Sequence, residues 1–325
     1  MFYEDIDHEQ LETDMNITLK ALRSEGPAVR QAIPVLSIGL AVRNGGQLIE
    51  RCIKSVLSQD FTDLELIVCD NASDDGTLET LEQFARADPR LKVRANPVNV
   101  GAHDNMRQAL DVSRGTFFRW ISHDDWLEPG CLSACIDALE SRPDAIGVST
   151  WFTIHTSNGS RYEEYRGEFP DSPDPVRRFE RMLWFFHAGD AKYDPMYGLW
   201  RRDCLARTSF PGPSERTDWL TVAELALRGP IINVDKRLAN RTRDYTPIDR
   251  AAYRLRSDPA RAEQLKTSAT RLYRELYALA VSARLSEPQL SRCRSALRLF
   301  WIKESMSAVR TRLSEARHRM FGRKV

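Results

Sequence analysis

Several absences limit what this chain can be. No apolar run approaches the roughly 20 residues that cross a bilayer, and the acidic start from Met1 to Glu12 lacks the form of a signal peptide. The formal net charge is only +1, so we do not expect nucleic acid as a partner. These absences predict a globular protein of the cytoplasm.

Cysteine is also too sparse for a secreted disulfide scaffold, because six cysteines are spread over 325 residues. Cys131 and Cys135 share one face of an expected helix, but no histidine or second cysteine pair follows at the spacing of a zinc site. We therefore expect buried thiols at these two positions rather than metal ligands.

Strand-like apolar runs and helix-like patterns alternate through the first half of the chain. Strands are expected at 35–42, 64–69, 91–94 and 116–121, with helical patterns between them. This alternation predicts an α/β fold in which a mostly parallel, Rossmann-like sheet is flanked by helices. From residue 249 onward the pattern changes to long, arginine-rich helices, which predict a C-terminal helical extension.

Polar residues follow the expected strands at the points where the strands end. In parallel sheets the ligand lies outside the carboxyl ends of the strands, so these residues are expected to converge on one edge. They are Arg43 and Asn44, Asp70 and Asn71, residues 96–101, and Asp124 and Asp125.

Asp124 and Asp125 directly follow the fourth strand, and a pair of carboxylates suits a hard cation such as Mn²⁺ or Mg²⁺. Adjacent acids also occur in solvated turns and helix caps, but the position at a strand end favours the metal. His123 beside them can serve as a metal contact, although a structural histidine is the somewhat stronger interpretation.

Asp70 and Asn71 can form hydrogen bonds to a base or ribose, and we favour this role over a turn and helix cap. For the next residues, 73–76, the turn is the better interpretation. Asn99 and Gly101 are expected to place backbone groups and a helix N-terminus close to a ligand bound at this edge, although the same pattern is a common turn signal.

A reaction in which a substrate hydroxyl attacks at this site also needs a base that takes the hydroxyl proton. The base must come from another part of the chain, and Asp218 is the candidate. It begins a helical pattern, so stabilisation of the helix dipole in the first turn is an equally good explanation from the sequence alone.

These motifs together resemble the inverting glycosyltransferases of family 2, from Pro34 to about Asp244. The match implies a GT-A fold at 33–248, with a nucleotide-sugar half at 33–130 and an acceptor half at 131–248. An N-terminal helical lead-in (1–32) and a basic helical segment (249–325) flank it. The matching segments are 36–44, 56–59, 68–77, 99–101, Asn105, Gly115, 123–129, 197–202 and 217–219.

The resemblance also implies residue roles. Asp218 corresponds to the base that deprotonates the acceptor, and Asp124 and Asp125 share contacts with ribose, diphosphate and a metal ion. The residues implied to line the nucleotide pocket are Ala41, Arg43, Asp70 and Asn71.

Three positions depart from the family pattern. Ser122 stands where many members have the first aspartate of an Asp-x-Asp motif, which predicts fewer carboxylates around the metal. Arg43 stands in place of the usual tyrosine, and Thr217 in place of the usual glutamate.

The expected activity is that of a metal-dependent glycosyltransferase that uses Mn²⁺ or Mg²⁺. It would move a sugar, with inversion, from a nucleotide diphosphate to a hydroxyl of a glycan or lipid-linked acceptor in glycoconjugate synthesis. Ser122 leaves open a catalytically degenerate partner subunit. A nucleotidyltransferase is a weaker alternative, because residues 43–46 make only a slight triphosphate loop.

The C-terminal helical segment combines arginines with Phe300 and Trp301. This composition indicates either peripheral contact with the inner face of the cell membrane or an ordinary packing or dimer-forming helix pair. The arginines are Arg292, Arg294, Arg298, Arg310, Arg312, Arg317 and Arg319.

Overall fold

The computed structural model describes residues 33–162, 165–188, 195–211, 216–243 and 268–321, with side chains through Met306 in the last range. The helical lead-in expected at residues 1–32 lies outside the described residues. The described residues from Pro34 onward form one compact unit.

Four parallel strands form the first half of the sheet, in the order β3-β2-β1-β4. Their side chains are largely apolar, and β1, β2 and β4 are buried on both faces, as in a sheet covered by helices. The predicted strands are confirmed to within one residue. Their bounds are β1 (Leu36–Val42), β2 (Leu64–Asp70), β3 (Leu91–Ala95) and β4 (Phe117–Ile121).

The second half of the sheet is mixed. After β4 the order continues β8-β6-β9-β5, with β7 paired to β6, and only β6 and β9 are parallel in this half. The register of β6 against β9 shifts twice, between Thr150 and Phe152. The bounds are β5 (Trp126–Leu127), β6 (Gly147–Thr156), β7 (Gly159–Arg161), β8 (Leu199–Arg201) and β9 (Ile231–Thr242).

Helices cover both faces of the sheet, and each face has its own hydrophobic core. The strand β4 shows the alternation, since Phe118 and Trp120 belong to one core and Phe117 and Ile121 to the other. One face carries α2 (Leu48–Leu57), α3 (Thr77–Ala87) and α5 (Cys131–Ser141). The other carries α4 (Ala102–Asp111), α6 (Pro175–Phe186) and α8 (Thr217–Arg228), with the short η1 (Pro195–Tyr197) and α7 (Arg202–Ala206) connecting to it.

The cysteines expected to be buried are buried. Cys131 and Cys135 are free thiols on α5, fully enclosed in the core that α5 shares with α2. Both side chains fill space in an apolar core, which is the common role of unoxidised cysteine.

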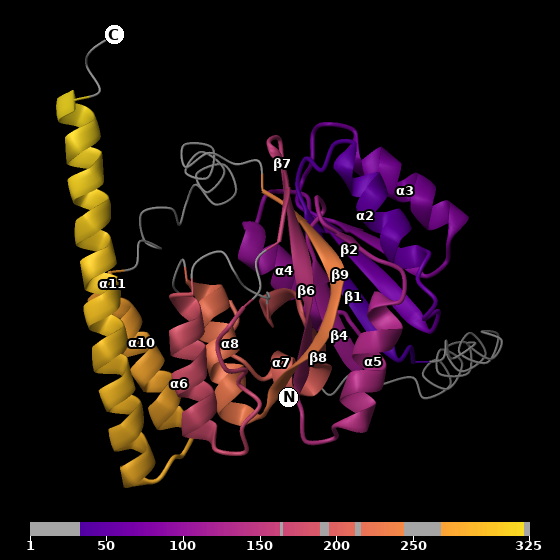
Figure 1. Ribbon diagram of the computed structural model, residues 1–325. Helices are drawn as coiled ribbons and strands as arrows, with labels where there is room; N and C mark the ends of the chain where they lie inside the picture. Colours follow the sequence, from indigo (N-terminus) through magenta and orange to yellow (C-terminus); the bar gives the residue numbers. More distant parts are fainter. Residues whose placement is uncertain (1–32, 163–164, 189–194, 212–215, 244–267, 322–325) are drawn as a thin grey trace, which may run out of the picture. The chain divides into compact units, whose positions relative to one another are not determined.

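The predicted C-terminal helical extension consists of α10 (Ala269–Ser282) and α11 (Glu287–Phe321). Leu276 of α10 and Leu297 and Phe300 of α11 are buried in the same core as α6 and α8. Figure 1 shows the yellow α11 running along α10 and α6 and continuing beyond both. In the described part of the chain, no helix has the length and apolar character needed to cross a membrane.

Candidate functional site

A pocket of about 560 Å³ opens at the carboxyl ends of β1 and β4. This volume falls in the range of small-molecule sites, which is roughly 300–1,000 Å³. The pocket combines polar side chains from the strand ends with the first turns of α4. Its lining residues are Ala41, Val42, Arg43, Asn44, Asn71, Asp74, Ala102, Asn105, Met106, Trp120, Ile121, Ser122, His123 and Tyr197.

Three of the residues predicted to bind the nucleotide sugar line this pocket, namely Ala41, Arg43 and Asn71. They meet because β1 and β2 are parallel neighbours whose last residues, Val42 and Asp70, lie side by side in the register. The convergence of polar residues on one edge, which the parallel arrangement of the strands predicted, is therefore present for β1, β2 and β4.

Asp70 lies just behind the wall of the pocket, and its side chain is about 1% exposed. Its two carboxylate oxygens accept hydrogen bonds from the backbone amide of Ser73 at 3.1 Å and the Ser73 hydroxyl at 2.5 Å. In this structure Asp70 therefore shapes the loop after β2, and its contact with a nucleotide stays a prediction.

The loop that follows β2 continues into the predicted turn. Asp75 accepts a hydrogen bond from the backbone amide of Thr77 at 3.1 Å, which satisfies a free N–H at the start of α3. Gly76 adopts a positive φ of 86° directly before the helix. The turn-and-cap interpretation of residues 73–76 is confirmed.

Asn71 connects the pocket to the loop before α4. Its amide oxygen accepts from the backbone amide of Val100 at 2.9 Å, and its amide nitrogen donates to Asn99 Oδ1 at 2.7 Å. Gly101, with a φ of 91°, then leads into α4, whose first residue, Ala102, lines the pocket. The helix N-terminus thus reaches the pocket as the sequence predicted, and Asn99 orients it through the backbone amide of Gly101.

A second pair of asparagines, Asn96 and Asn105, supports the loop before α4. Asn105 is 1% exposed and donates to the carbonyl of Cys69 at 2.7 Å, while Asn96 donates to Asn105 Oδ1 at 2.8 Å. These buried amides are satisfied by specific partners, so they fix the loop rather than adapt to it.

The backbone of the acidic loop after β4 is held by residues from distant parts of the chain. The Asp124 carbonyl accepts hydrogen bonds from the Arg51 guanidinium at 3.1 Å and the Thr242 hydroxyl at 2.7 Å. Arg51 also lies 3.7 Å over the ring of Trp126. α2 and β9 therefore clamp the loop from two sides.

The Cys52 thiol of α2 lies beneath the same loop and donates to the Ser122 carbonyl at 3.3 Å. Burial raises the pKa of this thiol well above its usual value, and the carboxylates of Asp125 and Asp124 raise it further. Cys52 therefore stays protonated and acts as a hydrogen-bond donor, not as a nucleophile.

The two carboxylates of the acidic motif have different partners. Asp124 Oδ1 accepts from the Ser122 hydroxyl at 2.5 Å, directly at the wall of the pocket. Asp125 Oδ2 forms a salt bridge with Arg241 at 3.0 Å, and its Oδ1 accepts from the backbone amide of Thr242 at 3.2 Å. The Asp125 carboxylate is therefore paired with Arg241, and the Ser122 hydroxyl holds one oxygen of Asp124 beside the pocket. The binding of a metal by these two carboxylates stays a prediction.

We expect Asp125→Asn to lower the free energy of unfolding by about 3 kcal/mol, because it removes the carboxylate charge that faces the largely buried Arg241. Urea unfolding of both proteins measures this loss. The double variant Asp125→Asn/Arg241→Met removes both charges and should recover part of it. A single variant as stable as the wild type would show that the pair contributes little.

Asp218 lies in the first turn of α8, and its side chain is exposed. It is not among the residues that line the pocket, but α8 contacts η1, whose last residue, Tyr197, does line it. The start of α8 is fixed by Trp219, whose ring stacks on Phe186 with centroids 4.5 Å apart. The assignment of Asp218 as the base stays a prediction, which the contact between α8 and η1 supports.

Arg241 and Tyr197 form a link that the sequence did not predict. The Arg241 guanidinium lies 4.2 Å over the Tyr197 ring while it pairs with Asp125, so it connects the acidic loop to the opposite wall of the pocket. Arg241 lies more than a hundred residues after the acidic motif, and no local pattern marks it as a partner.

His123 lines the pocket and is half-buried. His123 is therefore within reach of a bound ligand, and the choice between a functional and a structural role stays a prediction. Among the described residues no group of three or more His, Cys, Asp or Glu side chains could hold a metal ion without help from other ligands.

The comparison with known proteins identifies the family of the chain. The family model described as "Glycosyl transferase family 2" matches residues 37–204, just over half of the chain. The hyaluronan synthase of Pasteurella multocida is 29% identical over an aligned length of 136 residues, and the match covers 38% of this chain and 14% of the synthase. The chain therefore spans only a small part of that relative.

Two solved structures share the fold. S. aureus TarS 1–349 in complex with UDP-GlcNAc has a TM-score of 0.59 at 17% identity, over 81% of this chain and 71% of that one. The mannosyltransferase PcManGT from Pyrobaculum calidifontis, in complex with GDP-Man and Mn²⁺, has a TM-score of 0.53 at 17% identity, over 94% and 84%. The expected α/β fold of GT-A type is confirmed.

Proposed function

The chain belongs to glycosyl transferase family 2, and on that premise we propose that it transfers a sugar from a nucleoside diphosphate to an acceptor hydroxyl. The pocket at the strand ends carries this proposal. It holds Ala41, Arg43 and Asn71 on one side and the acidic loop on the other, at the edge of the sheet where such folds bind nucleotides. The nucleotide sugars bound by the two structural neighbours support the same class of substrate.

We infer a direct displacement at the anomeric carbon, with Asp218 as the base on the acceptor side and the diphosphate leaving from the other side. An acceptor oxygen forms a bond to that carbon as the bond to the diphosphate oxygen breaks, and the acceptor proton passes to the Asp218 carboxylate. Direct displacement inverts the configuration, and the nucleoside diphosphate leaves. General-base help of this kind contributes typically 10²–10⁴-fold.

A divalent metal suits the residues present. Mg²⁺ and Mn²⁺ take oxygen ligands, and Mg²⁺ commonly uses one or two carboxylates together with substrate phosphates. Asp124 supplies such a carboxylate, and Ser122 orients it through the 2.5 Å hydrogen bond. A bound metal would neutralise charge on the diphosphate leaving group. The Mn²⁺ in the mannosyltransferase complex supports this choice of ion.

The acceptor lies on the side of the site formed by the second half of the sheet. We propose a glycan or lipid-linked hydroxyl, in the synthesis of a polysaccharide, glycolipid or other glycoconjugate. The Pasteurella hyaluronan synthase, which is similar to part of the chain, supports this class of product.

A panel of nucleotide sugars tests the proposal by calorimetry with Mn²⁺ or Mg²⁺, with the same titration in excess EDTA. We expect at least one nucleotide sugar to bind in the presence of metal and to bind at least tenfold more weakly in EDTA. If none binds, the chain is a degenerate partner subunit. If it releases pyrophosphate from a nucleoside triphosphate and a sugar phosphate, it is a nucleotidyltransferase.

A further inference from the structure

The helix α11 carries two apolar stripes, and only one of them is covered by the rest of the protein. The first stripe, Cys293, Leu297 and Phe300, is buried against the neighbouring helices. The second begins at Leu299 and continues with Ile302 and Met306, whose exposed fractions are 67%, 47% and 53%. Large apolar side chains this exposed and this regularly spaced indicate a contact surface.

The sequence of α11 extends the second stripe to the end of the helix. From Leu299 onward, apolar residues recur at alternating steps of three and four residues, which is the a/d pattern of a heptad repeat. We call this set the α11 stripe. It consists of Leu299, Ile302, Met306, Val309, Leu313, Ala316 and Met320.

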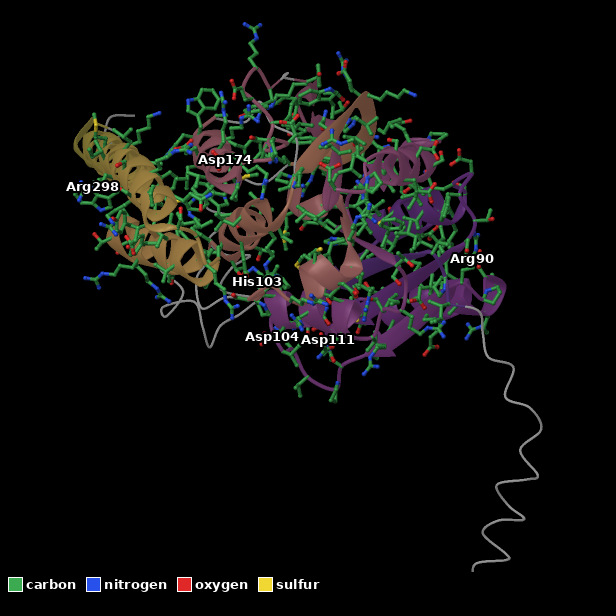
Figure 2. The ribbon with its side chains drawn as sticks, turned by 90° about the horizontal axis from the view of Figure 1, so that it is seen from below. Arg90, His103, Asp104, Asp111, Asp174 and Arg298 are labelled. Atoms are coloured by element: carbon green, nitrogen blue, oxygen red, sulfur yellow. The ribbon has the colours of Figure 1, made fainter. Side chains whose placement is uncertain are left out.

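Cations border this stripe along both edges. In the same repeat, the positions that flank the a/d residues are the e and g positions. All but one of them, Ser305, are arginine or lysine. The e positions are Lys303, Arg310 and Arg317, and the basic g positions are Arg298, Arg312 and Arg319. Arg298 and Lys303 are exposed, and Figure 2 shows Arg298 on α11 at the edge of the molecule.

This charge pattern argues against a second copy of the chain as the partner. In a parallel pair of helices the g residues face the e residues of the partner, and in an antiparallel pair e faces e and g faces g. Either arrangement would bring arginine or lysine against arginine or lysine. An apolar stripe with cations on both edges instead fits an anionic surface that accepts apolar side chains.

A groove beside the stripe widens the apolar surface. It has a volume of about 660 Å³ and lies between α6 and α11, where it is lined by Leu183, Trp184, Leu299 and Ile302, with Lys303 at its edge. Trp184 is 53% exposed. Tryptophan and lysine beside exposed aliphatic residues are typical of helices that lie in the headgroup region of a bilayer.

We propose that the α11 stripe binds the surface of an anionic lipid membrane, with α11 lying in the plane of the headgroups. The apolar stripe enters the boundary of the acyl chains, and the flanking arginines and lysines contact lipid phosphates. This inference goes beyond sugar transfer and does not depend on which sugar the pocket takes.

The test uses flotation of the full chain with vesicles of phosphatidylcholine, with and without phosphatidylglycerol, at low and at physiological salt. We expect binding to the phosphatidylglycerol vesicles to be at least tenfold stronger than to phosphatidylcholine alone and to weaken with salt. The variant Leu299→Ser/Ile302→Ser/Met306→Ser and the variant Arg298→Glu/Lys303→Glu should each lose at least tenfold in binding.

The matched control makes the same change of charge on another face of the protein. Lys54→Glu/Arg86→Glu alters two exposed cations on α2 and α3 and should bind vesicles within about twofold of wild type. Thermal unfolding and nucleotide-sugar binding show whether each variant is folded. Equal loss in the control, equal binding to both vesicle types, or no binding would overturn the proposal. So would a dimer in light scattering that the serine variant converts to a monomer.

Discussion

Asp218→Asn is expected to reduce the turnover number for sugar transfer by roughly 10²–10⁴-fold while the affinity for the nucleotide sugar stays within about twofold of wild type. The amide keeps the size of the side chain but cannot accept the acceptor proton at neutral pH. Asp218 is exposed at the start of α8 and is not among the residues lining the pocket, so removing its charge should leave the pocket intact.

Release of the nucleoside diphosphate in the presence of acceptor measures the turnover, and calorimetry measures the affinity. Asp203→Asn is the matched control, because Asp203 also lies in the first turn of a helix, α7, with its side chain 79% exposed. It should turn over at the wild-type rate. Wild-type turnover in Asp218→Asn would leave stabilisation of the helix dipole as the role of this carboxylate.

Asp124→Asn is expected to remove most of the benefit that Mn²⁺ or Mg²⁺ brings to nucleotide-sugar binding, a loss on the order of 10²-fold in affinity. Asp124 lies beside the pocket and is oriented by the Ser122 hydroxyl. An amide is a much weaker ligand for a hard cation than a carboxylate. Binding measured in EDTA should change little, because that measurement reports the nucleotide contacts alone.

Asp125→Asn provides the contrast for this experiment, since it removes the neighbouring carboxylate. The Asp125 charge is balanced by Arg241, so this variant should keep its dependence on metal even though it is less stable. If both variants lose the metal effect equally, the two carboxylates share the ion. If neither does, binding of the nucleotide sugar does not use a metal held by this motif.

The parallel half of the sheet could be predicted closely because its signals are local. Each strand is an apolar run, each is followed by a turn and a helical pattern, and the order of such units follows from general rules of chain connection. The meeting of Arg43 and Asn71 at the pocket was predictable for the same reason, since neighbouring parallel strands bring their ends together. The place of Ala41 was implied by the family resemblance.

The second half could not be predicted in this way. β6 and β9 are parallel neighbours, although β7, β8 and the helices α6 to α8 lie between them in the sequence. Their register also shifts twice, which a periodic pattern does not reveal. The asparagine contacts around Asn71 were also hidden, because an asparagine that builds a loop and one that binds a ligand have the same sequence signature. The domain boundary expected at residue 248 falls outside the described residues and stays a prediction.

The salt bridge between Asp125 and Arg241 has a consequence for how the site assembles. All the sequence motifs of the nucleotide-sugar half precede α5, yet the acidic loop is held by Arg241 and Thr242 at the far end of β9. A fragment that ended after β5 would contain the motif without the strand that fixes it. The acidic loop therefore has its full set of contacts only in a chain that includes β9, which makes those contacts a reporter for completion of the domain.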